Sequence, residues 1–222
     1  MSNEEFLPGF ERLRSVLKSR GQLVDCLPIP PAPFQVPQVV LDAPLDPMLI
    51  ALYSRCNGGF FGDLLIFRLA NDEGSLVGTN VLAREIRGGV RHSTFRFAKV
   101  QGLPNYLATV PSLGHVGEVQ PVVMSCNDMA DNVFPVASSV DRCLDLYATH
   151  CEERLVQFGA LDAEPALDQD SLLFPYSYVE QIARDAVLVK MLNEHRFDAL
   201  IAHTEEGQEW VRQVLAAARR LH

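Results

Sequence analysis

Residues 45–69 constrain the fold of this chain more than any other stretch, because they combine signals for a helix, a glycine turn and a strand. Asp46 suits a helix N-cap, and Pro47 fits the first helical position, where its missing N–H costs no hydrogen bond. The spacing of the next apolar residues predicts a helix that packs inward and runs to residue 56. Its apolar face consists of Met48, Leu49, Leu52, Tyr53 and Cys56.

The helical pattern stops at Asn57-Gly58-Gly59, and an apolar run of strand length follows at residues 64–69. Glycine adopts positive φ without steric cost, so this tripeptide is expected to close the last carbonyls of the helix and turn the chain into a sheet. We interpret Asn57, Gly58 and Gly59 as a structural turn and not as a ligand site. The same tripeptide is also an ordinary helix C-cap, so it does not identify a family by itself.

The segments on either side give weaker signals. An amphipathic helix is expected over residues 4–20, where apolar residues recur at helical spacing. Five prolines within residues 28–37 exclude a helix or a central strand and predict an extended surface segment, although their spacing also allows a ligand for an SH3-type domain. A short helix capped by Thr79 or Asn80 is expected to end at residue 86.

The part of the chain from residue 95 onward predicts four strands and then a long helix. Phe95 and Phe97 flank Arg96 in the pattern of a half-buried strand, and further strands are expected at residues 105–110, 121–125 and 133–136. Ser138 or Ser139 then caps the long helix, which has an apolar face for the sheet. Its opposite face is expected to meet water and carries Asp141, Asp145, Glu152 and Glu153.

These elements resemble the SUKH superfamily, in which a helix ending in Asn-Gly-Gly leads into a strand of the central sheet. The downstream segments Tyr106-Leu107-Ala108-Thr109-Val110, Pro121-Val122-Val123-Met124 and Phe134-Pro135-Val136-Ala137-Ser138-Ser139 follow the order of elements in that family. The resemblance implies one α+β domain with a mostly antiparallel central sheet flanked by helices. We place this domain at residues 1–158, a linker at 159–174 and a C-terminal helical extension at 175–222, which lies beyond the resemblance.

The resemblance also implies a function. Bacterial members of the superfamily are usually immunity proteins that bind and silence a co-encoded toxin, often a nuclease, and fungal relatives act as signalling or cell-wall scaffolds. We therefore expect a non-enzymatic immunity protein whose partner is a cognate toxin, such as a basic nuclease. The alternative is an intracellular scaffold or regulatory protein-interaction module without a cognate toxin.

The formal net charge of −9 disfavours nucleic acid as a direct ligand, because phosphate binding depends on Lys and Arg. Residues 141–185 hold ten acidic residues against three arginines, whereas residues 84–99 carry a net charge of +4. An acidic segment is often a solvated helix face and a soluble loop. It can also be complementary to a basic partner, and on that interpretation the expected partner-binding residues are Glu152, Glu153, Asp162, Glu164, Asp168 and Asp170.

No motif in the sequence indicates catalysis, a metal site or a cofactor. His-Glu-x-x-His, Gly-x-Ser-x-Gly and phosphate-binding glycine loops are absent, and residues 127–132 fit a tight turn better than a calcium loop because the glycine and the distal Glu are missing. The acidic N-terminus and the lack of a long apolar run favour a cytoplasmic protein without a membrane partner. The cysteines are expected to be reduced and mostly buried: Cys26, Cys56, Cys126, Cys143 and Cys151.

Overall fold

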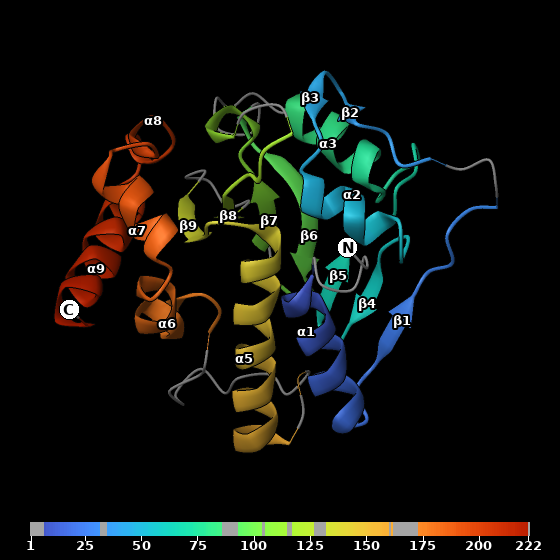
Figure 1. The fold of residues 1–222 in the computed structure, drawn as a ribbon, viewed down its shortest axis with the longest axis horizontal. Helices are drawn as coiled ribbons and strands as arrows, with labels where there is room; N and C mark the ends of the chain where they lie inside the picture. The colour runs from blue at the N-terminus through green and yellow to red at the C-terminus, as the bar shows by residue number, and fades with distance from the viewer. Residues whose placement is uncertain are drawn as a thin grey trace.

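A seven-stranded antiparallel sheet organises the chain in the computed structural model (Figure 1). The structure describes residues 7–31, 35–85, 93–103, 105–114, 117–126, 132–159, 161 and 173–221. In spatial order the strands are β1 (Val24–Cys26), β4 (Gly59–Phe61), β5 (Leu64–Ile66), β6 (Phe95–Val100), β7 (Asn105–Thr109), β8 (Val122–Cys126) and β9 (Val133–Ala137). A separate two-stranded ribbon pairs β2 (Val39–Val40) with β3 (Ala43–Pro44).

Helices pack against this sheet and beside its β9 edge. The N-terminal part contains α1 (Pro8–Ser19), α2 (Pro47–Tyr53), α3 (Leu76–Glu85), the 3-10 turn η1 (Pro111–Leu113) and α5 (Val140–Phe158). The C-terminal extension contains the 3-10 turn η2 (Tyr176–Tyr178), α6 (Val179–Ala183), α7 (Ala186–Asn193), α8 (Asp198–Ile201) and α9 (Glu205–Leu221). This arrangement confirms the α+β class, the mostly antiparallel sheet with flanking helices and the C-terminal helical extension.

Several local predictions are confirmed. Asp46 is the N-cap of α2, and its carboxylate accepts the N–H groups of Met48 and Leu49. Ser139 caps α5 by accepting the Arg142 N–H, and Gly159 ends that helix in the left-handed conformation. The three strands predicted downstream coincide with β7, β8 and β9 to within about one residue at each end. Of the cysteines, Cys56, Cys143 and Cys151 are buried, Cys26 is partly buried, and all four are free thiols.

The glycine turn has a different role from the one expected. Helix α2 ends at Tyr53, so the helix does not reach residue 56 and the glycines do not close its carbonyls. Gly58 and Gly59 have φ values of +75° and +131°, and Gly59 begins β4, a strand that the sequence pattern did not predict. A Cβ atom on Gly59 would lie 1.8 Å from the Asp25 carbonyl oxygen. The glycines therefore let β4 approach β1 closely.

Two further local predictions are wrong for a common reason. Thr79 and Asn80 do not begin a helix, because α3 begins at Leu76 and Asn80 is buried inside it. The Asn80 amide donates to the Leu76 and Arg96 carbonyls and accepts the Arg96 N–H, so its side chain pairs with β6. Arg96 is only 4% exposed and lies 4.2 Å from the centre of the Tyr106 ring, so β6 is buried rather than half-buried at this point. Both errors arise from contacts between separate segments, which join Asn80 to β6 and Arg96 to Tyr106 of β7.

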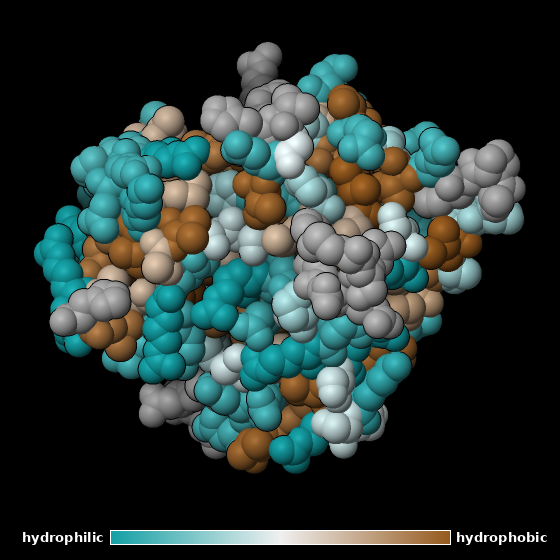
Figure 2. All heavy atoms as spheres, in the orientation of Figure 1, coloured by the Kyte–Doolittle hydropathy of each residue, from teal (hydrophilic) through white to brown (hydrophobic). Residues whose placement is uncertain are grey.

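The polar face of α5 does not simply meet water, because α1 lies alongside it (Figure 1). The Asp141 carboxylate accepts the backbone N–H groups of Gly9 and Phe10 at 3.1 Å each. Asp145 forms ion pairs with Arg12 and Arg142. The expectation of a fully solvated face is therefore wrong for Asp141 and Asp145, and what remains exposed on α1 and α5 is mainly hydrophilic in Figure 2.

The extension packs beside β9, the last strand of the sheet (Figure 1). The Trp210 indole N–H donates to the Pro135 carbonyl at 2.8 Å, and Gly207 brings α9 close to the Val133 carbonyl. Asp185 separates α6 from α7, and its carboxylate accepts the N–H groups of Ser138 and Leu188. The extension thus covers a strand edge whose carbonyls would otherwise lack protein partners.

Alanine at Gly59 is expected to destabilise the protein more than alanine at Gly74. Gly74 also has a positive φ (+74°), but no atom lies within 4 Å of its added Cβ. We expect Gly74→Ala to lower the free energy of unfolding by roughly 1 kcal/mol and Gly59→Ala by roughly 3 kcal/mol or more, because only Gly59 also meets backbone. Urea denaturation measures both changes, and equal losses would contradict a packing role for Gly59.

Candidate functional site

The expected acidic surface is described only at its α5 end, in Glu152 and Glu153. Glu152 is exposed, and its carboxylate lies 3.0 Å from the Arg12 guanidinium. Glu153 is partly buried, and burial followed by the hydrogen bond to Glu153 raises the pKa of the Tyr178 hydroxyl. The other expected positions, Asp162, Glu164, Asp168 and Asp170, lie outside the described residues. We call all six residues the α5 acidic surface; its role remains a prediction.

A buried polar network lies next to Glu152 and Glu153, the described end of this surface. The Tyr147 hydroxyl donates to Asp63 at 2.7 Å, and the Arg154 guanidinium lies 3.8 Å from the other Asp63 carboxylate oxygen. Burial raises the pKa of Asp63, while the Tyr147 hydrogen bond and the Arg154 charge oppose that shift. Because Asp63 belongs to the β4–β5 turn and the other two residues to α5, the network fixes the helix to the sheet.

His150 continues this network toward the extension. Its Nδ1 atom lies 3.3 Å from the Tyr178 hydroxyl, and its ring packs against Tyr147 and Phe174. Burial, with a smaller contribution from the Arg154 charge, lowers the pKa of His150 to about 3, so the ring is neutral at physiological pH. Burial also raises the pKa of the neighbouring Cys151 thiol, which disfavours the reactive thiolate. The cluster has the properties of a packed joint between α5 and the extension.

A hollow of about 550 Å³ lies where the first turns of α9 meet β9 and η2. Three aromatic rings line it: Phe134 of β9, Tyr176 of η2 and Trp210 of α9. Glu205, Glu206 and Glu209 form an acidic rim, with Arg212 as the basic residue among the lining side chains. We call this feature the α9 pocket.

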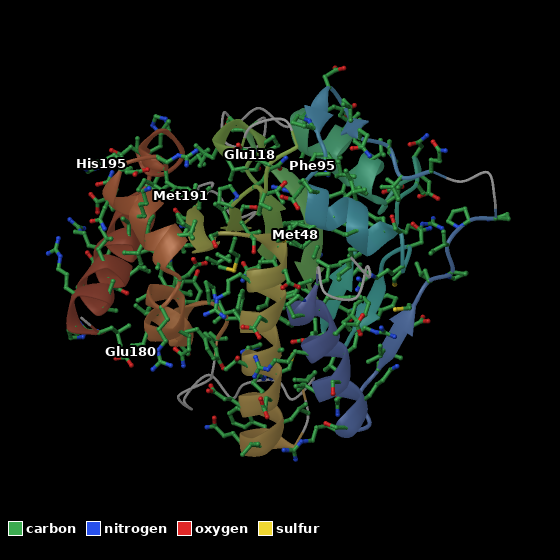
Figure 3. All side chains as sticks on the ribbon, viewed as in Figure 1. Met48, Phe95, Glu118, Glu180, Met191 and His195 are labelled. Atoms are coloured by element: carbon green, nitrogen blue, oxygen red, sulfur yellow. The ribbon has the colours of Figure 1, made fainter. Side chains whose placement is uncertain are left out.

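Two other hollows have rims of mixed charge. A groove of about 430 Å³ lies between α7 and the core, and its lining includes Glu118 and Met191 (Figure 3). Lys190, Glu194 and Arg196 also line this groove. A hollow of about 740 Å³ is lined by residues of α6 and α7 together with Leu221 of α9, and its charged residues are Arg184, Lys190 and Glu194. The α9 pocket differs from both because acidic side chains predominate on its rim.

Sequence reasoning did not identify the α9 pocket. Glu205, Glu206 and Glu209 fit the preference of a helix N-terminus for acidic residues, and that preference explains them without a ligand. Phe134, Tyr176 and Trp210 come from three separate elements, so no local spacing unites them. The one available signal was the single tryptophan of the chain, which follows Glu209 directly.

The described part of the chain shows neither a metal-holding cluster nor a helix that could span a bilayer. Within the described ranges, no group of three or more His, Cys, Asp or Glu side chains is placed to hold a metal ion. None of the helices described there has both the length and the apolar character that a bilayer span requires.

Comparison with protein-family models, with curated proteins and with solved structures found no match for this chain. Function must therefore be inferred from the geometry and charge of its surfaces.

Acidification is expected to destabilise the protein through His150. An unfolded histidine titrates near pH 6.5, whereas folded His150 stays neutral down to about pH 3, so protons bind preferentially to the unfolded chain between these values. This residue alone should remove up to about 1.4 kcal/mol of stability per pH unit as the pH falls below 6.5. The stability it contributes is complete above pH 6.5 and is lost toward pH 3.

Urea denaturation at several pH values measures this slope in the wild type and in His150→Phe, which keeps an aromatic ring in the cluster. The buried carboxyls Asp46, Asp63 and Asp141, whose pKa values burial raises, contribute with the opposite sign. Their contribution is common to both proteins and largely cancels in the comparison. The exposed His203→Gln serves as the matched control for the loss of one histidine. An equal slope in His150→Phe and wild type would contradict the assignment.

Proposed function

We propose that this chain is a non-enzymatic immunity protein that binds and neutralises a bacterial toxin with a basic surface, such as a nuclease. The observation that carries the proposal is the α9 pocket, which combines an acidic rim with an aromatic interior at an exposed junction of three elements. Aromatic side chains at the centre of a binding surface supply most of the affinity, while charges around them steer the partner and select it. The α9 pocket has both the central aromatic side chains and the surrounding charges.

The order of elements supports the SUKH-like part of the proposal. Helix α2 is followed by the Asn57-Gly58-Gly59 turn and a sheet strand, and β7, β8, β9 and α5 follow in the order that the resemblance implies. The net charge of −9 supports a basic partner, because opposite charge accelerates association between proteins. The buried thiols and the closed Asp63 network also fit a binding protein better than an enzyme.

A scaffold or regulatory module without a cognate toxin is the second candidate. The groove between α7 and the core favours it, because the exposed Val187 and Val119 lie among charges of both signs and offer a second surface for a different partner. The two candidates predict different neighbouring genes as well as different binding surfaces. A toxin reading frame next to the gene of this chain supports immunity, and co-expression should then protect cells from that toxin.

Reversal of two charges on the rim of the α9 pocket is expected to slow association with the toxin that the neighbouring gene encodes. The variant Glu205→Lys/Glu206→Lys leaves Glu209, which already pairs with Arg212 at 2.8 Å, unchanged. We expect the association rate to fall about tenfold at low ionic strength and by less at high salt, because screening weakens the steering. Surface plasmon resonance at two ionic strengths measures both rates.

The matched control is Glu73→Lys/Glu180→Lys, which changes two exposed charges outside the α9 pocket (Figure 3 labels Glu180). Circular dichroism confirms that both variants fold. If the two variants slow association equally, net charge alone explains the effect and the α9 pocket loses its role.

The α5 acidic surface is tested by reversing Glu152, Asp162, Glu164 and Asp168 together. Glu153 is left in place because it interacts with the Tyr178 hydroxyl. Single exposed ion pairs contribute only about 0 to 1 kcal/mol, so the combined variant is needed. We expect slower association with the toxin and a weaker salt dependence. An unchanged rate in the same resonance experiment would remove this surface from the interface.

A further inference from the structure

We propose that the α9 pocket receives an arginine side chain of the protein partner. This inference rests on the proposed function as a protein-binding chain and names the chemical group that anchors the partner. Three features of the pocket support it: its aromatic interior, its acidic rim and an unsatisfied buried acceptor.

The aromatic interior consists of three contacting rings and is partly open. The Phe134 ring centre lies 5.4 Å from that of Tyr176 and 5.8 Å from that of Trp210, and the three rings meet one another edge to face. Phe134 and Trp210 are 4% and 3% exposed, whereas Tyr176 is 45% exposed. The Trp210 indole is held by its hydrogen bond to Pro135. The two buried rings thus support Tyr176, whose ring offers a surface on which a cation can stack.

The acidic rim is available to a partner. Glu205 and Glu206 are exposed and form no ion pair with any described residue. Glu209 accepts hydrogen bonds from Arg212 and Gln213, an exposed arrangement that contributes little to stability. The helix dipole explains why acidic residues occur at the start of α9, but it explains neither the aromatic rings beside them nor the polar atom described next.

The side-chain oxygen of Asn132 supplies the independent observation. Asn132 is one of the residues that line the pocket, and its side-chain oxygen is buried and accepts no hydrogen bond from the described residues. A buried acceptor without a donor is costly, and such groups in native proteins commonly mark a place where a ligand or water completes the hydrogen bonding. An N–H donor of a bound partner would satisfy it.

Arginine fits these three features together better than other cations. Its planar guanidinium can stack on an aromatic ring while its five N–H groups donate in the plane to carboxylate and amide oxygens. Lysine has a compact ammonium that stacks less well and lacks the planar fork. A metal ion is disfavoured, because the acidic residues of the rim form no metal-holding cluster among the described side chains.

The single tryptophan of the chain makes the test specific, because emission excited at its red edge reports only Trp210. The folded full chain is titrated at constant ionic strength with N-acetyl-arginine amide, N-acetyl-lysine amide and N-acetyl-citrulline amide. Citrulline has nearly the shape of arginine without the charge. We expect saturable binding of the arginine compound in the millimolar range, with the lysine compound at least about threefold weaker and the citrulline compound at least about tenfold weaker. Calorimetry measures the same ratios without relying on emission.

Two variants localise the binding. Glu205→Gln/Glu206→Gln removes the unpaired charges, and Tyr176→Leu keeps an apolar side chain but removes the exposed ring. Each should weaken the arginine compound at least about fivefold. The control Glu73→Gln/Glu180→Gln removes the same charge from exposed positions elsewhere and should leave the affinity unchanged.

Equal binding of the citrulline or lysine compound, or equal weakening in the control variant, would overturn the assignment of an arginine site. Loss of arginine binding in both pocket variants, with circular dichroism unchanged, would support it. The toxin-protection experiment uses neither compound, so protection without arginine binding overturns this inference alone. Arginine binding without any toxin protection overturns the proposed immunity function and retains the pocket.

Discussion

The contact between α1 and α5 is the interaction on which the layered arrangement of this protein depends. Leu7 at the start of α1 offers no capping side chain, and the first N–H groups of that helix are instead accepted by Asp141 of α5. Gly9 makes this possible, because an added Cβ would lie 2.1 Å from the Asp141 carbonyl oxygen. A capping interaction that is normally local here joins residues more than 130 positions apart, and it places both helices over the same face of the sheet.

The side chains that this contact holds are buried in one apolar cluster, which extends from Leu7 to Ala218. Phe10 of α1 meets Phe61 of β4 edge to face, and Asp63 and Tyr147 join the next turn to α5. The His150 cluster then continues from α5 to the extension through Tyr178 and Phe174. The α9 pocket lies at the far end of this chain of contacts, on elements held in place by the core.

Local signals in the sequence predicted local structure well. Asp46, Pro47 and Ser139 identified two helix starts, and short apolar segments identified β7, β8 and β9, because capping and strand patterns depend on near neighbours. The failures share a different origin. Asn80 pairs with β6, Asp141 caps α1, and Gly59 approaches Asp25, all of them contacts between distant segments. The α9 pocket belongs to this second class, since its rings come from β9, η2 and α9.

The position of α9 beside β9 also has a consequence for how the protein is made. Trp210 donates to Pro135, so the residue that covers this strand edge is synthesised 75 positions after it. During translation the sheet can therefore form before its last edge is covered, and an uncovered edge is prone to pair with strands of other chains. The extension therefore protects the edge of the sheet only after the sheet itself has been synthesised. The nascent chain most needs a chaperone in the interval before α9 leaves the ribosome.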